Sequence, residues 1–139
     1  MATAVLGSDT NPGGRTYNED RVEVQHLTSR AGQALAVAVL ADGVGGEARG
    51  ERAAQLALDT FLGHMHTAEA EDVLSLMMAA FKAANQVVVA EARKLGQEGR
   101  MATTMVAGVN MYSIFSARPV RYPPHGPMAV RAKEYAPPV

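Results

Sequence analysis

The chain has 139 residues, the length of one ordinary domain, of which 47% are hydrophobic and 19% are charged. Its formal net charge of -1 gives the chain as a whole no basic character for binding nucleic acid, and the lack of cysteine excludes disulfides and thiol chemistry. No apolar run approaches the roughly 20 residues of a membrane span, and residues 1–7 lack the pattern of a signal peptide. We therefore expect a soluble, cytoplasmic globular protein with no nucleic-acid partner and no membrane span.

The first half of the chain predicts two strands. Residues 22–27 alternate apolar and polar side chains, which is typical of a half-buried strand. Residues 34–41 form a short, unbroken apolar run between a glycine turn and the dipeptide Asp42-Gly43. The length and β-branched content of this run predict a second strand that is buried on both faces.

Two helices are predicted next. In residues 47–64 apolar side chains recur every three or four positions, which indicates a helix that packs on one face. The residues that recur at this spacing are Ala53, Leu56, Ala57, Thr60 and Phe61. A longer periodic segment follows over residues 73–95, with Thr67 as the expected N-cap and Gly96 as the expected stop. Its apolar stripe comprises Val73, Leu76, Met77, Ala80, Phe81, Ala84, Val87, Val88 and Leu95, and the acids that would suit the positive end of its dipole are Glu69, Glu71 and Asp72.

A third strand is predicted over residues 101–109, after which the pattern changes. Six of the seven prolines lie after residue 115, and a segment so rich in proline cannot continue a helix or a central strand. We therefore expect one α+β domain over residues 1–110 and an irregular, proline-rich tail over residues 111–139. Five of the eight methionines lie in or beside the apolar segments and are expected to fill the core: Met65, Met77, Met78, Met101 and Met105.

An acid surrounded by glycines is the first sign of chemistry. Asp42 ends the second predicted strand, and four glycines lie within residues 39–51. A carboxylate and a backbone carbonyl are ligands that hard divalent cations prefer, so Asp42 and the carbonyl of Gly43 are expected metal ligands. Gly45 and Gly46 would allow a tight turn into the helix.

A second acidic group lies upstream in the stretch R-x-x-N-E-D-R, residues 15–21. Glu19 and Asp20 form an acidic pair, and Arg15 lies four residues before Glu19, where its guanidinium could bind a phosphate. Acid pair, strand-end acid and arginine together point to metal-assisted phosphoryl chemistry.

Each of these residues also has a purely structural interpretation. Asp-Gly is a common turn dipeptide, the acidic pair could be a solvated turn, and Arg15 could be a surface charge. The spacing of His64 and His66 occurs in some metal sites, but no third ligand lies nearby, so we do not expect them to bind metal. The glycine loop also lacks the Lys-Ser or Lys-Thr of a phosphate-binding loop, which argues against an ATPase.

The motifs in residues 15–21 and 40–51, followed by an amphipathic helix and residues 101–109, resemble the N-terminal half of the metal-dependent protein phosphatases, the PPM type or protein phosphatase 2C family, in its bacterial form. The resemblance covers roughly residues 8–109. It implies a four-layer α-β-β-α sandwich, here partial and truncated after about the third strand. It also implies two Mn²⁺ or Mg²⁺ ions and hydrolysis of phosphoserine or phosphothreonine on proteins by a metal-bound water.

The resemblance assigns a role to each site residue. Arg15 matches the phosphate-binding arginine, and Asp42 matches the aspartate that bridges the two metals. Gly43 matches the carbonyl ligand, Glu19 the acid that holds the second metal, and Asp20 a supporting acid. Residue 44 is valine where many eukaryotic members carry a histidine, so we assign no general acid.

The expected pattern stops after Asn110. The family continues with a Gly-Asp-Ser-Arg strand pair and later aspartates that complete the first metal's ligands, whereas residues 111–139 contain no aspartate and a single acid, Glu134. We therefore expect a truncated protein serine/threonine phosphatase with half of its metal cage and no turnover on its own. The alternative is a catalytically inactive, phosphatase-like binding or regulatory module that engages phosphoproteins through Arg15.

Overall fold

The computed structural model describes residues 5–32, 34–46, 49–69 and 72–111. Its elements are the strands β1 (Asp20–Thr28) and β2 (Ala34–Val44), the helices α1 (Arg49–Thr67) and α2 (Val73–Lys94), and the strand β3 (Ala102–Met111). Their order confirms the predicted sequence of two strands, two helices and one strand. Met111, the first residue of the predicted irregular tail, belongs to β3, and the other tail residues lie outside the described ranges, so the domain boundary stays a prediction.

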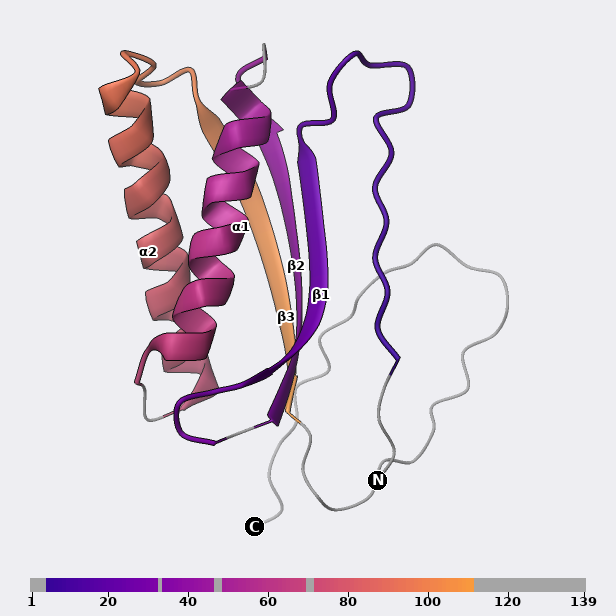
Figure 1. The fold of residues 1–139 in the computed structure, drawn as a ribbon. Coiled ribbons are helices and arrows are strands. Elements are labelled where there is room, and N and C mark those ends of the chain that lie inside the picture. The colour runs from indigo at the N-terminus through magenta and orange to yellow at the C-terminus, as the bar shows by residue number, and fades with distance from the viewer. Residues whose placement is uncertain (1–4, 33, 47–48, 70–71, 112–139) are drawn as a thin grey trace.

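The three strands form one antiparallel sheet in the order β1-β2-β3, and both helices lie on the same side of it (Figure 1). In this register Asp20 pairs with Asp42, and Asp42 pairs with Thr104 on the other side. The helix-facing side chains of β2 are buried: Leu35, Val37, Val39 and Ala41 are at most 1% exposed. The described chain therefore forms two layers, one of helices and one of sheet.

The prediction that β2 is buried on both faces is wrong for the described residues. Its side chains alternate between buried and exposed, and on the side away from the helices Leu40 is 48% exposed. Val106, which pairs with Leu40, is 69% exposed. We call this side the outer face; it carries Val22, Leu40, Asp42, Val44, Thr104 and Val106. The unbroken apolar run arises because apolar residues occupy the outer face although the described helices cover only the other one.

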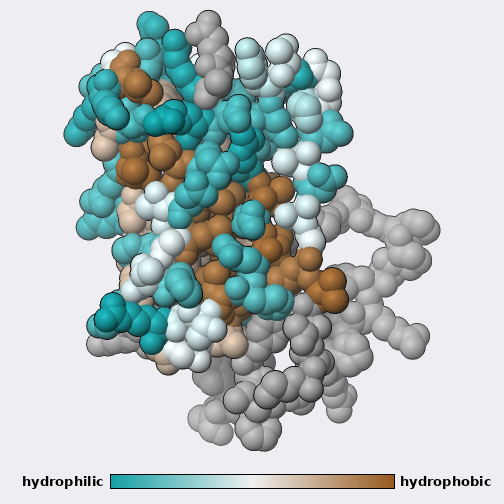
Figure 2. Space-filling model, viewed as in Figure 1, coloured by the Kyte–Doolittle hydropathy of each residue, from teal (hydrophilic) through white to brown (hydrophobic). Residues whose placement is uncertain are grey.

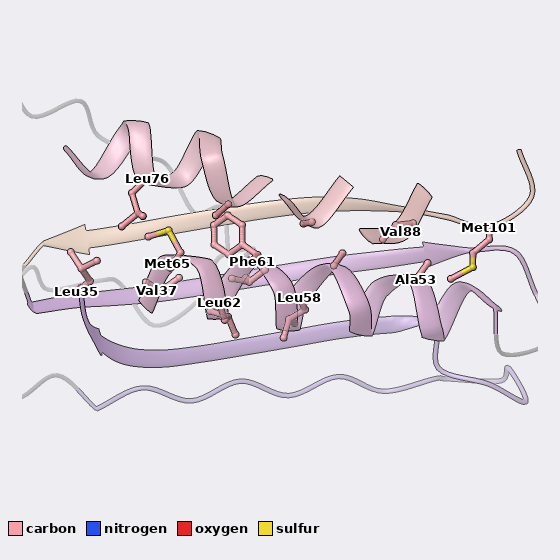
Figure 3. Close-up of a cluster of buried hydrophobic side chains, with 14 of the residues drawn as sticks. Leu35, Val37, Ala53, Leu58, Phe61, Leu62, Met65, Leu76, Val88 and Met101 are labelled. Carbon is pink, nitrogen blue, oxygen red and sulfur yellow. The ribbon is translucent and has the colours of Figure 1, made fainter. Parts of the chain in front are cut away.

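Helix α1 buries a wider stripe than its periodicity predicts. Ala53, Ala57 and Phe61 are buried as expected, but Leu56 and Thr60 are only partly buried. The additional buried positions are Gly50, Ala54, Leu58, Leu62 and Met65. The reason is that α1 packs against both the sheet and α2, so two of its sides are covered (Figure 3). The ring of Phe61 meets that of Phe81 in α2 with centroids 4.8 Å apart at 57°.

Helix α2 begins at another cap than the predicted one. Thr67 belongs to the last turn of α1, where its hydroxyl donates to the carbonyl of Gly63 at 2.8 Å. Asp72 is the N-cap instead, and its carboxylate accepts from the Ser75 amide at 2.8 Å. That amide and the Ser75 hydroxyl lower the pKa of Asp72 from its ordinary value. Of the acids expected at the positive end of the dipole, Asp72 lies there as the N-cap, whereas Glu69 precedes the helix and pairs with Arg30 at 2.9 Å. Glu71 lies outside the described residues.

The predicted stop of α2 is confirmed. Gly96 has a positive φ of 63°, and its amide donates to the Arg93 carbonyl at 3.1 Å. The Gln97 amide donates to the Ala92 carbonyl at 2.8 Å, which completes a Schellman motif. Glycine is favoured there because a side chain in this conformation is strained.

By length and composition, α2 is the one helix in the described ranges that could cross a membrane. The stripe through Leu76, Ala80 and Ala84 instead packs against the core. The length and apolar composition of α2 are therefore weak support for a membrane span. Two predicted core methionines, Met65 and Met101, are buried, whereas Met78 on α2 is 63% exposed and was predicted wrongly.

Candidate metal centre

The predicted site residues gather at one end of the molecule. There β1 begins, β2 ends, α1 begins, and the turn before β1 passes close by (Figure 1). The same end is mostly hydrophilic in Figure 2, whereas apolar residues gather over the middle of that view. The fold thus brings together the two motifs that lie about twenty residues apart in the sequence.

Backbone pairing continues one residue past the start of β1. The Gly43 amide donates to the Glu19 carbonyl at 3.1 Å. Because successive side chains of a strand point to opposite faces, Glu19 and Gly43 belong to the helix-covered face, while Asp20 and Asp42 belong to the outer face. The two acids of the predicted pair, Glu19 and Asp20, therefore lie on opposite faces of the sheet.

Asp20 and Asp42 are directly opposite each other across β1 and β2. Asp42 is exposed and Asp20 is partly buried. Asp42 lies within β2 rather than after it, because pairing continues through Gly43 to Val44. Like charges directly opposite each other destabilise a sheet, whereas two neighbouring carboxylates suit a shared divalent cation.

The carboxylate of Glu19 is packed against the first turn of α1. Its Oε1 atom is buried and has no hydrogen-bond partner in the described structure. A Cβ atom built on Gly50 would lie 2.3 Å from that oxygen, so the carboxylate occupies space that any side chain at position 50 would need.

The glycine turn into α1 is confirmed. Gly45 and Gly46 have φ angles of 150° and 57°, and the Arg49 amide donates to the Gly46 carbonyl at 2.9 Å. A Cβ on Gly45 would lie 2.9 Å from the Arg100 carbonyl oxygen. Both glycines are thus required by backbone geometry, whatever the function of the loop.

Arg15 lies in the exposed turn before β1. Its amide donates to the Pro12 carbonyl at 3.2 Å, which fixes the backbone of the turn. Its guanidinium makes no hydrogen bond or ion pair with the residues whose placement is described. The arginine is therefore available to an anion at this end of the molecule.

The residues that hold the motif in place carry no signal in the sequence. Arg21 donates from Nε to Gln55 of α1 at 2.9 Å and forms an ion pair with Glu51. Asn18 accepts from the Asp20 amide at 3.1 Å and donates to the Thr10 hydroxyl at 3.2 Å. No local sequence pattern predicts these contacts, because Arg21 and Glu51 are 30 positions apart.

Thr103 also carries no such signal, and it holds the backbone at Asp42. Its hydroxyl lies 2.9 Å from the Asp42 carbonyl oxygen and 3.0 Å from the Thr104 carbonyl oxygen. The main chain beside the Asp42 carboxylate is thus bonded to β3 both through the ladder and through a side chain.

The described acids offer a cation an incomplete set of oxygen donors. Asp42 and Asp20 offer carboxylates on one face, but nowhere in the described ranges do three or more acidic, histidine or cysteine side chains converge to hold a metal. His64 and His66 lie in the last turn of α1, at the end of that helix away from its glycine loop. A cation held by so few protein ligands depends on water, substrate or further ligands for its affinity.

The described fold is similar to solved structures of bacterial serine/threonine phosphatases. The Mycobacterium tuberculosis phosphatase PstP/Ppp matches with a TM-score of 0.54 and 31% identity, over 67% of this chain and 36% of that one. The catalytic domain of PstP in complex with two manganese ions matches with the same TM-score, 33% identity and the same coverage. A phosphatase from S. agalactiae matches with a TM-score of 0.54 at 20% identity, over 69% of this chain and 39% of that chain, which is a likeness of fold alone. No protein-family model and no curated protein matches the chain.

Fold and motifs together define a class, the bacterial PPM-type serine/threonine phosphatases, and this chain corresponds to their N-terminal part. Within that class the chain is similar to PstP over the matched region. It spans little more than a third of the length of those PstP structures, 36% of each. The predicted partial α+β sandwich is thereby confirmed.

Proposed function

We propose that this chain supplies the N-terminal part of a metal-dependent protein phosphatase site, with Asp42 and Asp20 at the cation and Arg15 at the phosphate. The single observation that carries the proposal is the register of β1 and β2, in which the two aspartates lie opposite each other on the exposed face. The manganese ions named for the PstP catalytic domain support the choice of Mn²⁺ or Mg²⁺.

The residues have distinct tasks in this proposal. The carboxylate of Asp42 holds the cation, and the Gly43 carbonyl and the Asp20 carboxylate add oxygen donors beside it. Glu19, whose carboxylate lies on the helix-covered face, would be the acid that holds a second metal. The guanidinium of Arg15 binds phosphate oxygens of a phosphoserine or phosphothreonine protein. A bound Mn²⁺ or Mg²⁺ supplies Lewis acidity and lowers the pKa of a bound water.

The described residues alone are not a complete phosphatase. Complete hydrolysis requires additional metal ligands, because the described acids form no closed ligand set. We therefore expect weak cation binding and no turnover of a phosphothreonine peptide by these 139 residues.

Cation binding is tested by titrating the purified chain with Mn²⁺ and following the free ion by electron paramagnetic resonance. We expect a dissociation constant on the order of 10⁻⁴ to 10⁻³ M, as for weak carboxylate sites, and at least a tenfold loss in Asp42→Asn. Glu98→Gln is the matched control, because Glu98 is an exposed acid outside the site. Equal Mn²⁺ affinity in the wild type and Asp42→Asn would contradict the proposal.

A second function, a binding module that recognises phosphoproteins without catalysis, is favoured by the unpaired guanidinium of Arg15 among the described residues. It predicts that a phosphothreonine peptide binds without metal and that Arg15→Ala abolishes this binding. Arg100→Ala serves as the control, since Arg100 is another exposed arginine. Binding that needs Mn²⁺ would favour the phosphatase site instead.

A further inference from the structure

Two glycines from different elements meet at the candidate metal centre. A Cβ atom built on Gly43 of β2 would lie 2.0 Å from the carbonyl oxygen of Gly50 in α1. A Cβ built on Gly50 would lie 2.9 Å from the carbonyl carbon of Gly43. The first turn of α1 therefore rests directly on the backbone of the strand that carries Asp42.

Gly50 touches a second member of the site. The Cβ built on it would lie 2.3 Å from Oε1 and 2.9 Å from Cδ of Glu19. Separations under 3.0 Å are essentially never seen for real Cβ atoms, so a side chain at position 50 and this placement of the Glu19 carboxylate exclude each other. Gly50 thus borders both the predicted carbonyl ligand and the predicted acid of the second metal.

The first turn of α1 is held from both sides, so it cannot easily move away to make room. On the side of β1, Arg21 binds Glu51 and Gln55. One turn further along, Ala53 and Ala54 are both 0% exposed. A Cβ added at position 50 would therefore displace the Glu19 carboxylate, the far end of a flexible side chain and its nearest obstacle, and would also press on the carbonyl carbon of Gly43 at 2.9 Å.

We propose that Gly50 is a positioning residue of the metal centre, whose missing side chain leaves the space that sets the Glu19 carboxylate beside Gly43. This inference rests on the proposed function, because it gives Glu19 a task at the cation. It assigns to Gly50 an effect on cation affinity that acts through Glu19 and not through the stability of the fold alone.

Gly50→Ala tests the inference, with Gly63→Ala as the matched control. Gly63 lies in the same helix with open space at its Cβ position, so alanine there should raise the urea midpoint without altering Mn²⁺ binding. For Gly50→Ala, measured without urea where the protein is folded, we expect at least a fivefold loss of Mn²⁺ affinity. In a Glu19→Ala background, Gly50→Ala should cause no further loss, because the group that it displaces is already gone.

The outcomes separate this inference from the proposed function. If the wild type binds no Mn²⁺, both are overturned. If the wild type binds Mn²⁺ and folded Gly50→Ala binds it equally well, or if its loss adds in full to that of Glu19→Ala, only the role of Gly50 is overturned. Should Gly50→Ala fail to fold, the double variant Glu19→Ala/Gly50→Ala decides. If the double variant folds, the proposed role of Gly50 is supported. If it does not fold, the role is overturned, because the alanine side chain would then clash with the backbone of Gly43 and not with Glu19.

Discussion

Two valines on opposite faces of the sheet provide a direct test of the two-layer architecture. Val39 faces the helices and is 1% exposed, whereas Val106 on the outer face is 69% exposed. Valine to alanine removes two methyl groups in either case. At about 0.8 kcal/mol per buried CH₂ plus a cavity term, Val39→Ala should lower the free energy of unfolding by about 2–3 kcal/mol. For Val106→Ala, only about a third of the transfer energy applies, or roughly 0.5 kcal/mol.

Urea denaturation followed by circular dichroism measures both variants. With an m-value of about 1 kcal/mol/M, Val39→Ala should lower the unfolding midpoint by about 2–3 M and Val106→Ala by about 0.5 M. The m-value should stay unchanged, because neither variant alters the extent of the fold.

Equal destabilisation by the two variants would refute the exposed outer face, since it would mean that something covers Val106 in solution. If the midpoint then rises with protein concentration, the cover is a second copy of the chain. A loss below about 1 kcal/mol for Val39→Ala would refute the packing of β2 against the helices.

Four other changes have defined outcomes. Phe61→Ala removes the largest fully buried side chain of the described residues and its contact with Phe81, so it should cost about 3–5 kcal/mol in thermal or urea denaturation. Arg21→Lys keeps the charge but loses the fork that binds Gln55 and Glu51, so it should cost about 1–2 kcal/mol in the same assay. The lowered pKa of Asp72 means that its cap stabilises the fold fully above the ordinary carboxyl pKa and loses this effect as the pH falls through the lowered value. Asp72→Asn should therefore flatten the pH dependence of the melting temperature at and below the ordinary carboxyl pKa. Asp42→Asn should raise stability by about 0.2–1 kcal/mol in the absence of metal, because it removes the repulsion from Asp20.

The order of elements could be predicted because it depends on local periodicity. The start of α2 could not be predicted in the same way, because Thr67 and Asp72 are both good caps and only five residues apart. The choice between them depends on how far α1 extends. In the structure α1 takes Thr67 into its last turn, which leaves Asp72 to bind the Ser75 amide.

Whether each face of β2 is buried could also not be predicted from the local sequence. A strand with an unbroken apolar run, such as residues 34–41, can be covered on one face or on both. The run shows only that both faces could be buried, and not that both are. The exposure of Leu40 is decided by which layers are present, and both described helices lie on the other side.

Only part of the candidate site could be predicted, because some of its residues are adjacent in sequence and others meet only when the elements pack. Asp42, Gly43 and the turn glycines follow from a strand, an acid and glycines that are adjacent in sequence. Arg21 with Glu51 and Gly50 with Glu19 are contacts between elements, and only the docking of α1 on β1 and β2 creates them. Sequence spacing therefore located the acids but not the residues that orient them.

The paired aspartates link stability to function at this end of the sheet. A pair of like charges in direct register weakens the strands that carry it, yet Thr103 and the Gly43–Glu19 backbone bond hold those strands together at that point. A chain selected for stability alone would lose one of the two charges at little cost, since Asp42 is exposed and a neutral residue there would relieve the repulsion. Strain of this kind is typical of a site where a ligand supplies the missing interaction. A divalent cation at the proposed site would do so, because it would convert the repulsion between Asp20 and Asp42 into shared attraction.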